Sequence, residues 1–239
     1  MHMTKEFLII KNIGRENPGL LEDVLKEHKI NSDVIGLHQI GKITSLQRYE
    51  AVIVLGGPAS ANDLNNNMNS ELALIQRIIT EGIPYLGICL GLQTLVKAMG
   101  GEVVKCQTKE VGFRDITGEY FSVELTPEGK TDPLFKKLPD SLRVFQLHGE
   151  TVILTQKMTL LAKGKFCHNQ IIKTGLNSYG IQSHFELTHD MLEEWIAEDT
   201  DLQEINKEQL LSDFESIKED YKNTGRQLFH NFLNIAGFI

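Results

Sequence analysis

The strongest constraint on the fold is a cysteine placed at a sharp turn between a predicted strand and a predicted helix. Ile83–Ile88 has the pattern of a short buried strand, and Leu90–Met99 has the pattern of a helix. Glycines lie two residues before and two residues after Cys89, so the backbone can turn there without a clash of Cβ atoms. This spacing is the G-x-nucleophile-x-G elbow with sulfur in place of the serine oxygen. A helix N-terminus favours the thiolate form, so the elbow predicts a nucleophile at Cys89 rather than a buried core cysteine.

The first half of the chain alternates strand and helix patterns. Ala51–Leu55 is the clearest buried strand, and Glu71–Thr80 carries an apolar stripe at helical spacing. Shorter segments precede them in the same alternation: Phe7–Ile10, Leu20–His28 and Val34–Leu37. Alternation of this kind is typical of a parallel sheet with helices on both faces.

From Val103 to Ser183 the pattern changes to short strands separated by turns: Tyr120–Leu125, Leu142–Leu147, Thr159–Ala162, Gln170–Lys173 and Ser178–Ser183. We interpret them as a mixed or antiparallel extension of the same sheet, because no linker or internal repeat divides the chain. The tail from His189 is helical, with an apolar stripe that predicts either packing on the domain or docking of a partner. The predicted fold is a flavodoxin-like open α/β sheet, mostly parallel with an antiparallel extension, helices on both faces and a helical C-terminal tail.

Composition and charge limit the classes of protein to which this chain can belong. The chain has 239 residues, 41% of them hydrophobic and 23% charged, as is usual for globular proteins that bury a full core. Its net charge of −8 disfavours nucleic acid or an anionic membrane surface as the main partner. No apolar run approaches the roughly 18 residues of a membrane span, and the N-terminus has no signal-peptide pattern. We therefore expect a cytoplasmic protein.

The cysteines agree with that location. They number three, and no two of them form a C-x-x-C pair. This pattern fits a reducing compartment better than a disulfide framework or a structural zinc site. Cys106 and Cys167 lie in no elbow, and we expect them to be structural. The sequence thus predicts neither a metal ion nor another cofactor.

A cysteine nucleophile needs a base and a group that orients the base. His184 directly follows a predicted strand, and Glu186 comes two residues later. In an extended segment residues two apart point the same way, so the carboxylate can lie beside the imidazole. There it would select one tautomer and stabilise the imidazolium form. The His-x-Glu pattern alone is weak evidence for a catalytic pair, but together with the elbow it predicts a site made by Cys89, His184 and Glu186.

A pair of glycines, Gly56 and Gly57, ends the clearest buried strand. This is the carboxyl edge, where α/β sheets place their sites. Glycine there can turn a backbone N–H toward a ligand oxygen, and the N–H of Leu90 follows the nucleophile directly. The two N–H groups predict an oxyanion hole, with a plain turn as the alternative interpretation.

Taken together, these residues resemble the class I glutamine amidotransferases, the type with a Cys-His-Glu triad. The resemblance runs from about Phe7 to Glu186 and rests on Gly56-Gly57-Pro58, the elbow from Gly87 to Gln93, and His184-x-Glu186 after a Tyr-Gly-Ile-Gln strand. Within the family the chain looks most like stand-alone members akin to the glutaminase domain of GMP synthetase. Glu110-Val111-Gly112 and the segment from Gln146 to Glu150 resemble parts of that branch.

The resemblance implies hydrolysis of the side-chain amide of glutamine. Cys89 would attack the γ-carbonyl to form a glutamyl thioester, His184 would pass the proton to the leaving ammonia, and Glu186 would orient His184. The resemblance further implies Gly57 and Leu90 as oxyanion donors, and Gly56, Gln93 and His148 as substrate-binding residues. It also implies an amidotransferase domain over 4–188, with 189–239 as a helical extension packed on it.

Two departures from the family pattern leave alternatives open. Phe185 stands where the family usually has the proline of His-Pro-Glu, which loosens the backbone but keeps both side chains. No ATP-pyrophosphatase signature follows Glu186, so a separate synthetase subunit would accept the ammonia. Alternatively, the chain acts alone as a peptidase or hydrolase on a small γ-glutamyl compound. A third possibility is an inactive homologue that binds or regulates.

Overall fold

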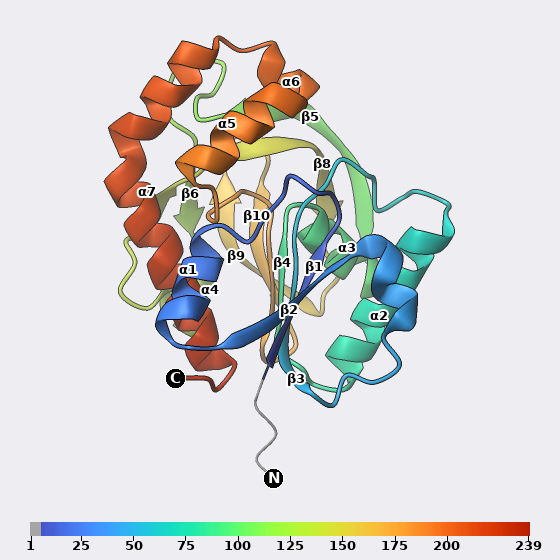
Figure 1. Ribbon diagram of the computed structural model, residues 1–239. Helices are drawn as coiled ribbons and strands as arrows, with labels where there is room; N and C mark the ends of the chain where they lie inside the picture. The colour runs from blue at the N-terminus through green and yellow to red at the C-terminus, as the bar shows by residue number, and fades with distance from the viewer. Residues whose placement is uncertain (1–5) are drawn as a thin grey trace.

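The computed structural model describes residues 6–239, and a nine-stranded mixed sheet runs through its centre (Figure 1). The strands are β1 (Glu6–Lys11), β2 (Asn31–Gly36), β3 (Tyr49–Val54), β4 (Tyr85–Ile88), β5 (Glu102–Gly112), β6 (Ser122–Leu125), β7 (Ser141–Arg143), β8 (Gln146–Ile153), β9 (Met158–Gly164), β10 (Asn169–Thr174) and β11 (Ser178–Ile181). The helices are α1 (Leu20–Glu27), α2 (Asn66–Thr80), α3 (Leu90–Ala98), α4 (Pro127–Thr131), α5 (His189–Glu198), α6 (Thr200–Gln203) and α7 (Lys207–Ile235), with 3₁₀ turns η1 (Leu37–Lys42) and η2 (Pro133–Phe135). The strand order in the main sheet is β2-β1-β3-β4-β11-β10-β9-β6-β7.

The first five strands in this order are parallel, and they form the half of the sheet that the sequence predicts best. Side chains alternate between the faces of a strand, so a strand that is apolar throughout needs cover on both faces. Phe7 and Ile9 of β1 belong to one core cluster with residues of α1 and α7, whereas Leu8 and Ile10 belong to another with residues of α2 and α3. Figure 1 shows α1, α5 and α7 on one side of the sheet and α2 and α3 on the other. The predicted α/β fold is confirmed.

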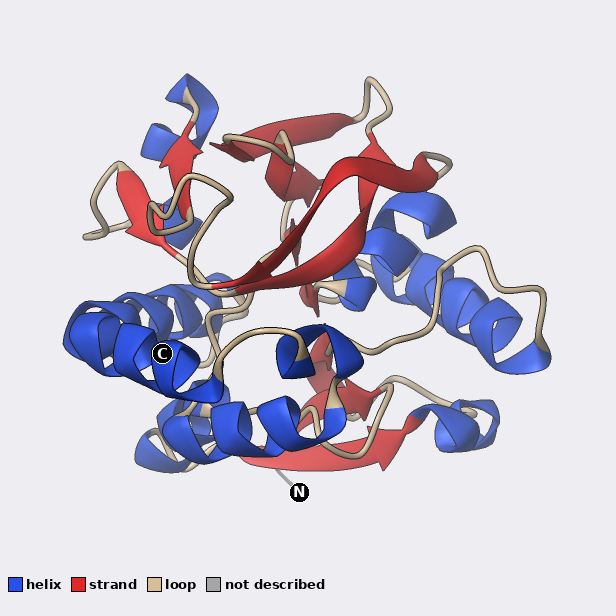
Figure 2. Ribbon diagram, turned by 90° about the horizontal axis from the view of Figure 1, so that it is seen from above, coloured by secondary structure: helices blue, strands red, loops and turns tan. Residues whose placement is uncertain are grey.

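The remaining strands of the sheet, β10, β9, β6 and β7, are antiparallel, as the predicted extension requires. The ribbon of β5 and β8 differs from expectation, because these two strands form a separate two-stranded sheet (Figure 2). The prediction that the strands after Val103 all extend the main sheet is therefore wrong for this ribbon. The predicted strand Leu142–Leu147 is divided between β7 and β8, and Phe145 in the gap forms an isolated bridge with His184. That bridge ties the start of the ribbon to the end of β11.

The C-terminal helices pack on the face that carries α1. The apolar stripe of α7 is buried in the same core cluster as β1, while Leu211 is partly buried beside it. The buried residues of the predicted stripe are Phe214, Ile217, Tyr221, Leu228 and Phe232. A helix face that is covered in this way cannot also dock a partner. A boundary between 4–188 and 189–239 stays a prediction, and its residues 4 and 5 lie outside the described part of the chain.

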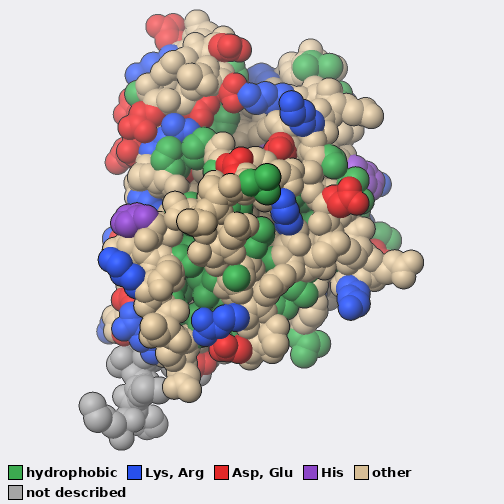
Figure 3. Space-filling view, turned by 90° about the vertical axis from the view of Figure 1, so that its right-hand side faces the viewer, with side chains coloured by type: hydrophobic (Ala, Val, Ile, Leu, Met, Phe, Trp, Pro, Cys, Tyr) green, Lys and Arg blue, Asp and Glu red, His purple; other side chains and the backbone are tan. Residues whose placement is uncertain are grey.

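Charge on the surface is mixed. On the face seen in Figure 3, acidic and basic side chains are interspersed, and Lys and Arg do not gather into one extended patch. Across residues 6–239 no helix combines the length and the apolar character that crossing a membrane would need. The expectation that nucleic acid is not a partner stays a prediction.

Candidate active site

Cys89 lies at the carboxyl end of β4, directly before the first residue of α3. Its backbone angles, φ 52° and ψ −104°, fall in a region that residues with a side chain rarely adopt. A Cβ at Gly91 would collide with the carbonyl oxygen of Val54 in β3, so the helix can start this close to the sheet only with glycine there. The structure has the strand–turn–helix elbow that the spacing predicts, and backbone strain of this kind gathers at functional sites.

His184 comes to the same edge of the sheet because β11 pairs in parallel with β4. Its Nδ1 lies 2.6 Å from Oε1 of Glu186, and both side chains are buried. Burial lowers the pKa of His184, but the Glu186 carboxylate and hydrogen bonds with Cys89 and Glu186 outweigh burial and raise that pKa well above its usual range. The imidazole therefore favours the protonated form, and it lies between the sulfur of Cys89 and the carboxyl group of Glu186.

Phe185, at the position of the usual proline, supplies a hydrogen bond that proline cannot make. Its backbone N–H donates to Oε2 of Glu186 at 3.0 Å, and proline has no N–H. One oxygen of the carboxylate thus faces His184 while the other is held by the backbone. The Phe185 side chain itself is buried in the core. The departure from the family pattern keeps the carboxylate oriented.

Helices α5 and α7 anchor the segment that carries His184. The hydroxyl of Tyr221 donates to the carbonyl oxygen of His184 at 2.8 Å. A Cβ at Gly225 would collide with the carbonyl oxygen of Phe185, so α7 approaches this closely only with glycine. The Trp195 ring lies edge-on to the imidazole, with the ring centroids 5.0 Å apart. The apolar stripe of the tail predicts packing, but not that the tail would hold the histidine segment.

The predicted oxyanion donors lie on adjacent segments beside the elbow. A Cβ at Gly57, just after β3, would come 3.4 Å from the side chain of Leu90. Leu90 is the first residue of α3, so its N–H has no partner within the helix. The arrangement is compatible with an oxyanion hole, and the role of these two N–H groups stays a prediction.

A pocket of about 500 Å³ opens beside the elbow. Four of the predicted residues line it, namely Cys89, Gly57, Gln93 and His148, whereas His184 and Glu186 lie behind its wall, each 1% exposed. The other lining residues come from five parts of the chain: Arg15, Glu16, Pro58, Ala59, Ser60, Lys105, Lys109, Leu147, Gly149, Glu150, Asp199, Thr200 and Asp201. Asp199, Thr200 and Asp201 belong to the tail, so the helical extension completes the rim.

Two of the predicted substrate-binding side chains are tied to protein groups. Nε2 of Gln93 lies 3.3 Å both from the carbonyl oxygen of Glu150 and from Oε1 of Gln182. Gln182 in turn points its Nε2 at Sγ of Cys89, 3.7 Å away, and the sequence offered no signal for it except its place just before His184. Both ring nitrogens of His148 also have protein partners. Contacts of Gln93 and His148 with substrate stay predictions.

Glu16, a buried carboxyl at the pocket wall, is not among the residues that the sequence predicts for the site. A Cβ at Gly56 would collide with Oε2 of Glu16 and lie 3.3 Å from Cβ of Cys89, so this glycine makes room for the carboxyl next to the thiol. Burial, opposed by the charge of His184, raises the pKa of Glu16 to about 7. Among the described residues Oε2 has no hydrogen-bond partner. A lone acidic residue in a loop carries no motif, so nothing in the sequence singles it out.

Comparison with known proteins places this geometry in a family. The model of the family "Glutamine amidotransferase class-I" matches residues 10–200. The glutamine amidotransferase-like protein YfeJ of Salmonella typhimurium is 31% identical over 150 residues, which cover 61% of this chain and 60% of that protein. The glutamine-hydrolysing GMP synthase of Syntrophomonas wolfei is 28% identical over 191 residues, which cover 78% of this chain and 34% of the synthase. The chain therefore spans less than two thirds of the length of either relative.

A solved structure agrees over nearly the whole chain. The crystal structure of a glutamine amidotransferase from Thermotoga maritima matches with a TM-score of 0.84 and 28% identity, covering 97% of this chain and 99% of the other. The agreement includes the helical tail, because it leaves only a few residues of either chain unmatched. The family match, the fold and the elbow lead to one conclusion: this chain belongs to the class I glutamine amidotransferases.

Proposed function

We propose that this chain hydrolyses the side-chain amide of glutamine to glutamate and ammonia. The observation that carries the proposal is the strained elbow at Cys89 beside a His184–Glu186 pair with a 2.6 Å contact, at the wall of a pocket. A thiolate, an imidazolium and an orienting carboxylate are the parts that nucleophilic acyl transfer needs. In this proposal the catalytic residues are Cys89, His184 and Glu186.

The first half of the reaction forms a thioester. The thiolate of Cys89 attacks the γ-carbonyl carbon, and the oxygen becomes an oxyanion that the N–H groups of Gly57 and Leu90 stabilise. The C–N bond then breaks, and the imidazolium of His184 gives its proton to the leaving nitrogen, which departs as ammonia. Glu186 holds the imidazole in the required tautomer throughout.

The second half of the reaction hydrolyses the thioester. His184, now neutral, takes a proton from a water molecule that attacks the same carbon, and the C–S bond breaks. Glutamate leaves, and the thiolate–imidazolium pair is restored. Each half uses the same oxyanion donors, so a single geometry serves both steps.

The charges around the pocket suit the amino-acid end of glutamine. Lys105 and Lys109 line the pocket, and Glu150 supplies a carboxyl group. A zwitterion with one ammonium and one carboxylate finds a partner of opposite charge for each. The glutamyl moiety would therefore bind with its amide toward Cys89 and its charged end toward these side chains.

The longer relatives suggest an acceptor for the ammonia. The GMP synthase of Syntrophomonas wolfei is about three times as long as its matched region, and that region covers 34% of it. We propose that a separate synthetase subunit accepts the ammonia from this chain. Such a partner predicts glutaminase activity that rises when the synthetase and its substrates are present.

Covalent labelling tests nucleophile and substrate together. A glutamine analogue that carries a chloroketone should add one equivalent to the wild-type chain, and glutamine should protect against it. Cys89→Ala should not be labelled although Cys106 and Cys167 remain, and its release of glutamate from glutamine should be undetectable. Labelling that persists in Cys89→Ala, or that glutamine does not slow, would contradict the proposal and favour an inactive homologue.

A second candidate function is hydrolysis of a small γ-glutamyl compound. The size of the pocket favours it, because about 500 Å³ lies in the range of roughly 300–1,000 Å³ that accommodates ligands larger than one amino acid. Turnover of glutamine and of γ-glutamyl dipeptides, measured side by side as kcat/KM, separates the two. A clear preference for glutamine rules against the second candidate, and a preference for the dipeptide overturns the first.

A further inference from the structure

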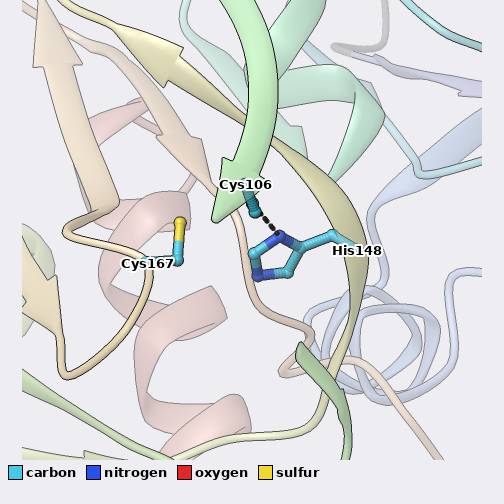
Figure 4. A group of neighbouring side chains, drawn as sticks. All are labelled: Cys106, His148 and Cys167. Atoms are coloured by element: carbon cyan, nitrogen blue, oxygen red, sulfur yellow. Dashed lines mark hydrogen bonds between the residues drawn. The ribbon is translucent and has the colours of Figure 1, made fainter. Parts of the chain in front are cut away.

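A second group of thiols and imidazole lies beside the pocket, on other elements than the elbow. Cys106 is on β5, His148 is on β8, and Cys167 is in the loop between β9 and β10 (Figure 4). Their ligand atoms, Sγ of both cysteines and one ring nitrogen of His148, all lie within 4.8 Å of one another. Sγ of Cys106 is 3.6 Å from Nδ1 of His148. Around tetrahedral zinc, with Zn–S about 2.3 Å and Zn–N about 2.0–2.1 Å, such ligand atoms lie about 3.5–3.8 Å apart.

A break in strand pairing brings these side chains together. Lys105 of β5 pairs with Glu150 and Glu110 pairs with His148, so four residues on β5, 106–109, have no register partner. The extra length bends β5 and places Cys106 over the imidazole of His148. Bulges of this kind redirect side chains and gather next to functional sites.

Glu110 orients the imidazole as the carboxylate of a metal site does. Its Oε2 lies 2.9 Å from Nε2 of His148, and both residues are buried. The remaining contacts of that carboxylate hold the third ligand, because Oε1 accepts from the backbone N–H of Cys167 at 3.3 Å and Oε2 accepts from Gln170 at 3.0 Å. Metal-binding histidines almost always donate their second ring N–H to such a group, which leaves the other nitrogen free to ligate.

Nδ1 of His148 therefore has two possible partners. It lies 3.0 Å from the carbonyl oxygen of Glu150, where a proton on Nδ1 would be donated. A metal ion between Nδ1 and the two sulfur atoms would replace that proton, because only unprotonated imidazole and thiolate ligate. Two thiolates also neutralise the charge of a divalent ion.

We propose that Cys106, Cys167 and His148 bind a zinc ion, with Glu110 as the residue that positions His148. Two thiolates and one imidazole are a soft ligand set that suits zinc, and the fourth position is left to water. This departs from the expectation of no metal, which rested on spacing: Cys167 comes 61 positions after Cys106, so no short motif could show the site. The proposal does not depend on glutamine hydrolysis.

The metal would stabilise the ribbon that forms one side of the pocket. A two-stranded sheet alone is marginally stable, and zinc would join β5, β8 and the β9–β10 loop. The carbonyl oxygen of Leu147, next to His148, lies 3.8 Å from Sγ of Cys89. Occupancy of the zinc site should therefore also order the strand that faces the nucleophile.

Cobalt substitution tests the proposal directly. The parent is Cys89→Ala, so that the elbow site offers no thiolate, and a phosphine reductant keeps the other two thiols reduced. Cobalt(II) should produce a thiolate-to-cobalt charge-transfer band that saturates at one equivalent and disappears on addition of zinc. Cys106→Ser and Cys167→Ser, each in this parent, should weaken binding at least about 100-fold, and Glu110→Gln should weaken it about 10–100-fold.

A surface histidine pair supplies the matched control. The rings of His28 and His230 are 5.1 Å apart and also offer two ring nitrogens, so His28→Ala in the same parent should leave the cobalt band unchanged. The absence of a thiolate band in Cys89→Ala, or unchanged affinity for cobalt in Cys106→Ser, overturns the proposal. If the serine variants do not fold, alkylation of the parent decides: zinc should protect both remaining thiols, and unprotected thiols rule the site out.

Discussion

Two sets of sulfur, imidazole and carboxylate lie beside the same pocket, which both Cys89 and His148 line. At the elbow, His184 lies between Cys89 and Glu186, with Nδ1 2.6 Å from the carboxylate. In the β5–β8 ribbon, His148 lies between Cys106 and Glu110, with Nε2 2.9 Å from the carboxylate. The residue types are the same, yet we assign catalysis to the first set and metal binding to the second.

The backbone around the sulfur accounts for the difference. Cys89 has a φ of 52° and precedes the N-terminus of α3, whereas Cys106 lies within a strand and has no positive φ. The helix N-terminus and the neighbouring N–H groups can stabilise a thiolate and then an oxyanion. The ribbon instead places a second thiol, Cys167, within 4.8 Å of the other two ligand atoms. We therefore assign the two roles from the backbone conformation around each cysteine, because the types of side chain nearby are the same.

The largest expected effect comes from exchanging the two carboxylates for amides. Glu186→Gln deprives His184 of the group that selects its tautomer, so kcat for glutamine should fall about 10²–10⁴-fold. Glu110→Gln should lower kcat much less, while it weakens zinc binding. Steady-state glutamate release by the two variants measures this. If kcat fell equally in Glu186→Gln and Glu110→Gln, the assignment of catalysis to the first set alone would be wrong.

Glu16, the buried carboxyl beside Cys89, should make the free energy of unfolding depend on pH. Burial raises the pKa of Glu16 from 4.5 to about 7, so the folded chain holds this proton more tightly than the unfolded chain. The stabilisation is therefore full below pH 4.5 and is lost as the pH rises through 7, by about 3 kcal/mol. Urea unfolding of Glu16→Gln between pH 4.5 and 8 should show a correspondingly flatter profile.

Glu71 is the matched control for Glu16. Burial raises its pKa to about 7 as well, and it lies in α2, away from the pocket lining. Glu71→Gln should flatten the pH profile in the same direction. When glutamine fills the pocket of Cys89→Ala, the contribution of Glu16 to the pH dependence of stability should change, whereas the contribution of Glu71 should not. A ligand effect that Glu71→Gln removes and Glu16→Gln retains would contradict the placement of Glu16 at the site.

Backbone strain at the elbow predicts that glycine and alanine differ in stability with opposite signs at Cys89 and at Cys106. At Cys89, with its φ of 52°, the glycine variant should be more stable than the alanine variant by about 1–2 kcal/mol. At Cys106, in a strand, the alanine variant should be the more stable by about 0.5–1 kcal/mol. The free energies of unfolding of the four variants, measured without metal, check the signs. The same sign at both positions would show that the elbow is not strained.

The smallest effect concerns the helix that anchors His184. Tyr221→Phe removes the hydrogen bond to the carbonyl oxygen of His184, which should cost about 1 kcal/mol of stability and lower kcat several-fold. Tyr179→Phe removes a comparable bond, 3.1 Å from Asp132, and should cost similar stability with kcat unchanged. If kcat fell equally in both variants, the hydrogen bond from α7 would not be what positions His184.

The sequence alone predicted the parallel half of the fold and the components of the elbow site. These features are local: apolar runs and stripes define β3, β4 and α3, glycines at fixed offsets define the turn at Cys89, and the two-residue period of an extended chain brings Glu186 to His184. The strands after Val103 were predicted less well, because a short apolar run does not say which sheet it joins. Phe145 shows this, since its bridge to His184 lies where one predicted strand splits between two sheets.

Only the tertiary structure decided which distant residues share a site. Glu16 and Gln182 reach Cys89, Tyr221 reaches His184, and Cys106 meets Cys167 through contacts between segments far apart in the chain. The physical reason is that no periodicity or short-range spacing marks these contacts. Even Tyr221, which lies in the apolar stripe of α7, is predicted by that stripe only to pack. Their neighbours come from strand order, from the bulge in β5 and from the packing of α7. The sequence by itself determined the elbow at Cys89 and the pairing of His184 with Glu186, because both depend on local spacing. The tertiary contacts determined the pocket, the anchor of the histidine and the cluster of Cys106, His148 and Cys167.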